Sequence, residues 1–153
     1  MENRPFYNEV LTEHNIHPAH KAKLMKPAKE LRGVNPSCGD DITLQLRLSD
    51  DGTTIEDGSF VGDGCAISQA SADMMLDLVI GRSAEEALKL KDTFLRMIKE
   101  KISDEELDTL EEAQSLKDIS HMPSRVKCAV LGWHTLEEIL SGNGKESVTT
   151  EDQ

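Results

Sequence analysis

Hydrophobic and polar positions alternate most regularly between Ile42 and Leu48, where four aliphatic side chains occupy the even positions and polar side chains the odd ones. This period of two predicts a half-buried β-strand. The turn-forming residues 49–52 follow, and Thr54 to Val61 is predicted to be a second strand, with Gly58 as a weak point or bulge. A hairpin alone is marginally stable, so we expect it to pack on helices or to gain another strand.

Elsewhere the pattern follows the helical period. The predicted helices are Phe6 to Asn15, Cys65 to Ile80, one that begins at Ser83, a shorter one that begins at Ser103, and Ser124 to Leu140. Ser83 and Ser103 are each followed three residues later by a glutamate, which is the layout of a capping box. Gly81 is typical of a helix C-terminus, and Pro123 suits a first helical turn.

The remaining segments are predicted to be irregular. His17 to Lys29 is a polar loop with four lysines and two histidines, either solvated or used for docking, and Ser115 to Met122 is a connector. Residues 142–153 are polar and are expected to form a disordered tail. A hairpin followed by helices indicates an α+β fold, with residues 1–141 as a single domain.

Composition narrows the classes of function. The net charge of −12 argues against nucleic-acid and anionic-membrane partners, because both attract Lys and Arg clusters. No apolar run reaches the ~18–20 residues that span a bilayer, and the N-terminus lacks the layout of a signal peptide, so we expect a cytoplasmic protein. In that compartment three cysteines indicate metal binding or catalysis rather than a disulfide framework.

The three cysteines and one aspartate form the candidate site. Cys38 and Asp40 flank Gly39, and in extended backbone residues two apart point to the same side. Cys65 begins a predicted helix, where the helix dipole favours a thiolate, and Cys128 lies one turn into the last helix. Three thiolates and a carboxylate can complete a four-coordinate metal site, although the spacing alone is not that of a zinc finger. Each cysteine taken singly could instead be a small buried hydrophobe.

Three stretches together resemble the SufU branch of the IscU-like proteins of iron–sulfur cluster assembly: Asn35 to Asp40 with the strand pair, Gly-Asp-Gly-Cys-Ala-Ile-Ser-Gln-Ala-Ser-Ala-Asp from Gly62, and Arg-Val-Lys-Cys-Ala-Val-Leu-Gly-Trp from Arg125. The resemblance runs from about Tyr7 to Leu140. The scaffold-type IscU branch has a histidine before the third cysteine, where this chain has Lys127. The segment from about Ile102 to His121 resembles the insertion that marks the SufU branch.

The resemblance implies a small antiparallel sheet of about three strands packed on helices, with a metal site at one end. It implies that Cys38, Asp40, Cys65 and Cys128 are zinc ligands, with Asp40 rather than the neighbouring Asp41 in the set. It also implies that Cys38 accepts persulfide sulfur from a pyridoxal-phosphate cysteine desulfurase of the SufS type, after a histidine of the desulfurase takes its place on zinc. The sulfur then passes to downstream scaffold proteins. Such a protein is a co-substrate and activator of the desulfurase rather than a stand-alone enzyme.

Two other functions stay open. The same ligands could hold an iron–sulfur cluster under assembly, which would make the chain a scaffold, or the site could be a purely structural zinc centre. Arg125 either steadies Asp40 through a charge-assisted bond or is a plain surface residue. The histidines and Asp73 are expected to be solvated, surface or packing residues.

Overall fold

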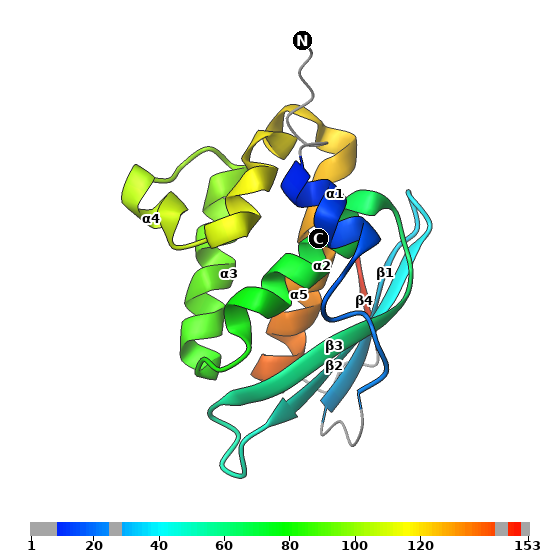
Figure 1. The fold of residues 1–153 in the computed structure, drawn as a ribbon, viewed down its shortest axis with the longest axis vertical. Coiled ribbons are helices and arrows are strands. Elements are labelled where there is room, and N and C mark those ends of the chain that lie inside the picture. The colour runs from blue at the N-terminus through cyan, green and yellow to red at the C-terminus, as the bar shows by residue number, and fades with distance from the viewer. Residues whose placement is uncertain (1–8, 25–28, 143–146, 151–153) are drawn as a thin grey trace.

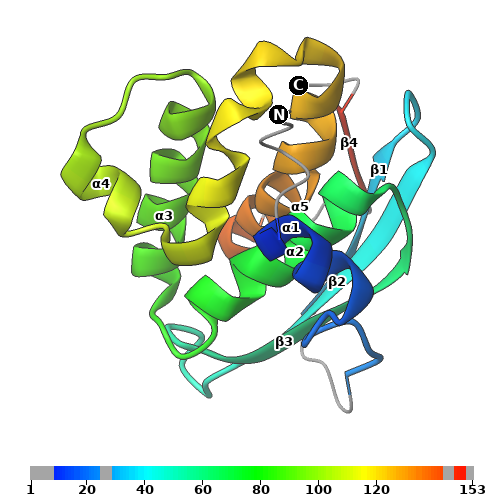
Figure 2. The ribbon, with the colours of Figure 1, turned by 45° about the horizontal axis from the view of Figure 1, so that its top comes forward.

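The computed structural model describes residues 9–24, 29–142 and 147–150. Its sheet has four strands in the order β3-β2-β1-β4. They are β1 (Lys29–Asn35), β2 (Asp40–Leu48), β3 (Ile55–Asp63) and β4 (Ser147–Thr149). The first three are antiparallel neighbours and β4 runs parallel to β1. The helices gather on one face of this sheet (Figures 1 and 2), so the predicted α+β class is confirmed.

The predicted hairpin is present as β2 and β3. The aliphatic side chains of Ile42, Leu44 and Leu46 are fully buried beneath the helices, as the alternation predicts. Gly58 is not a bulge, however, because it pairs in regular register with Leu46 and the irregularity lies between Arg47 and Leu48. A Cβ atom at Gly58 would lie 2.8 Å from the Leu76 side chain, so glycine is needed there for close helix packing.

Two strands lie where none was predicted. In β1 the buried positions are Leu31, Gly33 and Asn35, of which only the first is hydrophobic, so no apolar alternation marks the strand. The expected disorder of the tail is wrong for residues 147–150, because β4 pairs with β1 and buries Val148. The other tail residues after Gly142 lie outside the described part of the chain.

The described residues also form six helices. They are α1 (Glu9–Ile16), α2 (Ala66–Val79), α3 (Ala84–Ile98), α4 (Asp104–Asp108), the 3-10 helix η2 (Glu111–His121) and α5 (Pro123–Ser141). Both predicted capping boxes are present, at Ser83 and Ser103. Helix α1 lies within the predicted span, of which Phe6 to Asn8 fall outside the described residues.

The predicted connector from Ser115 to Met122 is wrong, because most of it belongs to η2. This element buries Ala113, Leu116 and Ile119, whose spacing of three matches the 3-10 period. That period differs from the α-helical one, and the apolar positions in the sequence therefore do not predict an α-helix.

Helices α2 and α5 form the centre of the molecule, between the sheet and the outer elements. Most residues of α2 are buried, and α5 presents Trp133 to Phe94 of α3 with ring centroids 4.9 Å apart. Among the helices that the structure describes, none is both long enough and apolar enough to cross a membrane. The N-terminus of α2 and the first turns of α5 lie at the end of the sheet where a turn joins β1 to β2. The cysteines meet there.

Candidate metal centre

The fold brings the three cysteines together from three separate segments. Cys38 lies in the turn between β1 and β2, Cys65 is the N-cap of α2, and Cys128 lies in the second turn of α5. Cys38 and Cys65 are half-buried, whereas Cys128 is fully buried. The Sγ atoms of Cys38 and Cys128 are 3.2 Å apart.

The approach of Cys38 to Asp40 has a different origin from the one expected. The backbone is not extended here: residues 36–39 form the hairpin turn, closed by the Cys38 amide donating to the Asn35 carbonyl at 3.2 Å. Gly39 has a φ of 73°, a conformation that glycine adopts without strain. Asp40 then begins β2 opposite Asn35, so a turn rather than a strand pleat sets the pair.

Asp40 is the organising carboxylate of the site. It is 1% exposed and accepts hydrogen bonds from Asn35 Nδ2 at 3.0 Å, the Cys65 amide at 2.7 Å and Ser68 Oγ at 3.1 Å. These bonds join the hairpin to the first turn of α2. By contrast, Asp41 points outward to Arg32, whose hydrogen bonds of 2.6 and 2.8 Å lower the pKa of Asp41. Asp41 therefore does not compete for the site.

Glycine is required at position 64, beside this carboxylate. A Cβ atom there would lie 2.4 Å from Ser68 Oγ and 3.0 Å from Asp40 Oδ1. The Cys65 amide that follows is consequently free to donate to Asp40.

One donor atom each from Cys38, Asp40 and Cys128 lie within 4.8 Å of one another, close enough to share one ion. Cys65 is not in that group, and its Sγ accepts from the Ser68 amide at 3.4 Å and lies 3.8 Å from Ser68 Oγ. We infer that a small movement of the Cys65 side chain would bring its sulfur to the same ion. The structure thus brings Cys38, Asp40 and Cys128 within reach of one ion, with Cys65 close by at the start of α2.

The thiols of Cys65 and Cys128 titrate as a pair in the metal-free chain. The neighbouring Cys128 thiol, followed by the hydrogen bond from the Ser68 amide, lowers the pKa of Cys65 to about 6. Interaction with the Cys65 thiol, together with burial, raises the pKa of Cys128. One proton therefore stays on Cys128 while Cys65 is ionised, because a second buried thiolate so close requires a compensating cation.

Arg125 places its positive charge beside the thiols. The charge-assisted bond to Asp40, which was one of two expectations for Arg125, is not formed. Its Nη1 atom donates to Cys38 Sγ at 3.8 Å, and Asp40 takes its own hydrogen bonds from other residues. The neighbouring thiols of Cys128, Cys38 and Cys65 raise the pKa of Arg125. Lys127 is exposed.

Two further residues of the site were missed from the sequence. Asn35 Nδ2 donates to both Asp40 and Cys128, the latter at 3.4 Å, and Asn35 Oδ1 accepts from Thr150 Oγ1 at 2.9 Å. Ser68 links Asp40 to Cys65. Neither residue has a pattern of its own, although Asn35 borders the Cys-Gly-Asp motif and Ser68 occupies the first turn of the predicted helix.

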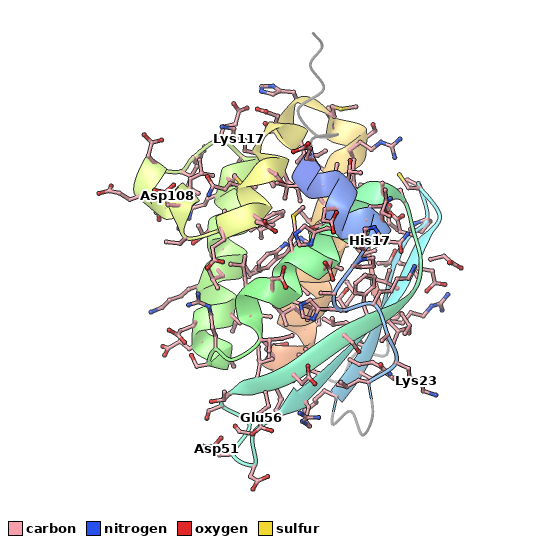
Figure 3. All side chains as sticks on the ribbon, in the orientation of Figure 1. His17, Lys23, Asp51, Glu56, Asp108 and Lys117 are labelled. Atoms are coloured by element: carbon pink, nitrogen blue, oxygen red, sulfur yellow. The ribbon has the colours of Figure 1, made fainter. Side chains whose placement is uncertain are left out.

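The remaining titratable candidates lie elsewhere. His134 is near Glu137 on α5, and burial lowers the pKa of His134. Asp73 was expected to be a surface charge, but it is 1% exposed and pairs with His14. In the predicted basic loop, Lys21 Nζ donates to Gln69 and His20 to Asp77, while residues 25–28 lie outside the described part. Figure 3 marks this segment at His17 and Lys23.

Comparison with known proteins identifies the architecture. The model of the NifU-like N-terminal domain matches residues 6–143. An iron–sulfur cluster assembly scaffold protein IscU from Streptococcus pyogenes is 39% identical over 134 residues, which cover 88% of this chain and 82% of that one. A zinc-dependent sulfurtransferase SufU from Bacillus subtilis is 37% identical over 132 residues, covering 86% and 87%.

Solved structures agree. A crystal structure described as an iron–sulfur cluster assembly scaffold protein for the SUF system, from Fervidobacterium islandicum, has a TM-score of 0.81 at 36% identity and covers 88% of this chain and 96% of its own. The N-terminal part of a NifU-like protein from Brucella abortus shares the fold, with a TM-score of 0.73 at 22% identity and coverage of 90% and 93%.

Proposed function

Since this chain belongs to the NifU-like N-terminal domain family, we propose that it acts in iron–sulfur cluster assembly as a zinc-dependent sulfur acceptor. It takes persulfide sulfur from a pyridoxal-phosphate cysteine desulfurase. The observation that carries this proposal is the asymmetry of the three thiols. Cys38 is half-buried on a turn beside Arg125, whereas Cys65 caps a helix and Cys128 is fully buried.

The donor set fits zinc. Cys38, Cys65, Cys128 and Asp40 offer three sulfurs and one oxygen, and thiolate-rich four-coordinate sites of this kind suit Zn²⁺. When bound, the ion supplies the positive charge that lets neighbouring thiols stay ionised near neutral pH. A cation at this site would compensate the buried negative charge that otherwise keeps a proton on Cys128.

The transfer itself is a thiol exchange at Cys38. The Cys38 thiolate attacks the outer sulfur of the desulfurase persulfide, a new S–S bond forms on Cys38, and the desulfurase cysteine leaves as a thiolate. No oxidant is consumed, because one persulfide replaces another. Arg125 donates to Cys38 Sγ at 3.8 Å and so places a positive charge beside the reacting sulfur. The sulfur is then available to a downstream scaffold protein.

A scaffold role is the second candidate, and the 39% identity to a protein named as an IscU scaffold favours it. The same three sulfurs could hold iron and sulfide. Lys127 before the third cysteine and the 102–121 segment distinguish this chain from the scaffold type that the resemblance describes. A scaffold would exchange its zinc for iron when Fe²⁺ and sulfide are supplied, whereas a zinc-dependent acceptor would keep it.

The deciding experiment measures cysteine-desulfurase turnover with and without the zinc-loaded chain under mild reductant. We expect strong stimulation by the wild type, loss of stimulation in Cys38→Ser, and retention in Ser37→Ala, an exposed residue of the same turn. Mass spectrometry should find one additional sulfur atom on Cys38. Absence of stimulation by a folded, zinc-bound sample would contradict the proposal. Transfer that persists in Cys38→Ser but fails in Cys128→Ser would move the acceptor.

A further inference from the structure

A second group of metal-binding side chains lies well away from the cysteines. We call it the His14 cluster: His14, His20, Asp73, Asp77 and Glu112. It forms where α1, the segment after it, α2 and η2 meet, and both ribbon views show α1 lying across α2 (Figures 1 and 2). On α2, Asp73 and Asp77 follow Cys65 by eight and twelve residues, which is about 12 and 18 Å along the helix.

His14 is held in the orientation that metal-binding histidines have. Its Nδ1 atom is 2.6 Å from Asp73 Oδ2, and Asp73 is 1% exposed. The other oxygen of Asp73 accepts the His20 amide at 2.8 Å, so the carboxylate is fixed from two sides. Histidine ligands almost always donate their second ring nitrogen to such a carboxylate, which leaves the first nitrogen free for the ion.

The second ring nitrogen of His14 faces two carboxylates. Nε2 is 2.6 Å from Glu112 Oε1 and 4.0 Å from Asp77 Oδ2. One donor atom each from His14, Asp77 and Glu112 lie within 4.8 Å of one another. Asp77 is itself positioned by His20 Nε2, which lies 2.7 Å from Asp77 Oδ1. Three donors therefore converge, and two further residues of the cluster orient them.

The surroundings leave room and charge for a cation. An open depression of about 400 Å³ is lined by Asp77 and Glu112 together with Met74, Leu78 and Glu111. In the described part of the chain the ion pairs of Asp73, Asp77 and Glu112 involve histidine alone, with neither lysine nor arginine. The three carboxylates carry a formal charge of −3, and an ion bound at His14 Nε2 would replace the proton between that nitrogen and Glu112.

We propose that the His14 cluster binds a divalent first-row transition-metal ion through His14 Nε2 and one oxygen each of Asp77 and Glu112. One imidazole and two carboxylates suit Mn²⁺, Fe²⁺ and Zn²⁺, and the exposed side leaves coordination positions for water. The ion ties α1 and η2 to α2, since each supplies one ligand. This site is separate from the cysteine centre and does not depend on the function proposed for it.

Mn²⁺ is the probe for this site, because thiolate sites strongly prefer zinc and a zinc-loaded cysteine centre will not take it up. We would titrate the zinc-loaded full chain with Mn²⁺ and follow the electron paramagnetic resonance signal of the free ion. The wild type should bind one Mn²⁺, and its Tm should rise by roughly 5–10 °C at a hundredfold excess over Kd. Zinc content is measured before and after, so exchange at the cysteines is detected.

Glu112→Gln is the test variant, because its side chain is largely exposed and the change should not disturb folding. We expect it to weaken Mn²⁺ binding by at least about tenfold. Glu13→Gln is the matched control: it removes the same charge from an exposed residue next to His14 but no donor atom of the cluster. Equal weakening in both variants would mean diffuse attraction to an acidic surface and would overturn the proposal. So would binding below one ion per chain in the wild type.

Discussion

The two ends of α2 carry two different kinds of side-chain cluster. At the N-terminal end, three sulfurs and the buried Asp40 are assembled by a turn, a helix cap and hydrogen bonds to backbone. Toward the C-terminal end, the His14 cluster is assembled from side-chain pairs between α1, α2 and η2, and two of its carboxylates are substantially exposed. The cysteine centre is built into the buried core. The His14 cluster joins elements that already have their own packing contacts.

This difference predicts different consequences of change. At the cysteine end, the Asp40 carboxylate is buried and has three hydrogen-bond partners, so even a small substitution there disturbs the site. At the other end, an exposed carboxylate can be replaced with little effect on the metal-free fold. The following predictions test that contrast from the largest expected effect to the smallest.

The largest effect is expected for Asp40→Asn on zinc affinity. The change removes an anionic ligand from the proposed zinc set and weakens the charge-assisted hydrogen bonds that Asp40 accepts. Zinc affinity should therefore fall by at least about a hundredfold. The measurement is competition with a chromophoric chelator. Asp41→Asn is the matched control, because Asp41 points outward to Arg32, and it should leave zinc affinity unchanged. Equal affinities in the two variants would remove Asp40 from the ligand set.

Gly64→Ala should destabilise the metal-free chain by about 1–3 kcal/mol. The new Cβ atom meets Ser68 Oγ at 2.4 Å, so Ser68 must rotate and give up its hydrogen bonds to Asp40 and the Cys65 carbonyl. Urea unfolding measures the change. Gly132→Ala in α5 is the control, because its Cβ would make contacts of 3.5 Å or more, and there alanine should be neutral or stabilising. An unchanged midpoint in Gly64→Ala would show that the first turn of α2 adapts freely.

Cys65 should be a reactive thiol in the metal-free chain. Because hydrogen bonding lowers its pKa to about 6, the rate of alkylation by iodoacetamide should rise about tenfold between pH 5 and pH 7 and then level off. Peptide mapping assigns the rate to Cys65. Cys128 should stay unreactive over this range, since it is buried and its pKa is raised. A Cys65 rate that keeps climbing through pH 8 would contradict the proton sharing between the two thiols.

The sequence was informative wherever one residue type determines a local structure. Alternating aliphatics identified β2, and the serine–glutamate pairs identified the starts of α3 and α4. The strand β1 escaped because its buried positions include glycine and asparagine, and β4 because three residues form no period. In both, burial is imposed by neighbouring elements rather than by the hydrophobicity of the segment itself.

The two clusters differ in the same way. In the amino-acid sequence, the cysteines, the glycines beside them and a family resemblance all indicate the cysteine centre. The fold brings Cys38, Asp40 and Cys128 together, with Cys65 at the adjacent helix cap. Asn35 and Ser68 act there only through tertiary hydrogen bonds. The His14 cluster joins positions 14, 20, 73, 77 and 112, which share no spacing, so only the packing of α1 and η2 on α2 brings them together.

The smallest effect is expected in the pH dependence of stability without metal. Burial lowers the pKa of His14, but the hydrogen bonds and charges of Asp73 and Glu112 outweigh it and raise that pKa above 6.5. A raised folded-state pKa stabilises the chain fully below the unfolded value, and this contribution is lost as pH rises through the folded value. In the presence of a chelator, the difference in unfolding free energy between the wild type and His14→Gln should therefore shrink from about pH 6 to pH 9. The decrease should be about 1 kcal/mol or less, because Glu112 is exposed and solvent screens its charge. Glu13→Gln should show no such trend, and a difference that grows with pH would mean that His14 is neutral in the fold. A cluster that gives so little stability by itself leaves the attachment of α1 and η2 to their apolar packing, including the buried Leu11 and Leu116, in contrast to the hydrogen-bonded cysteine end.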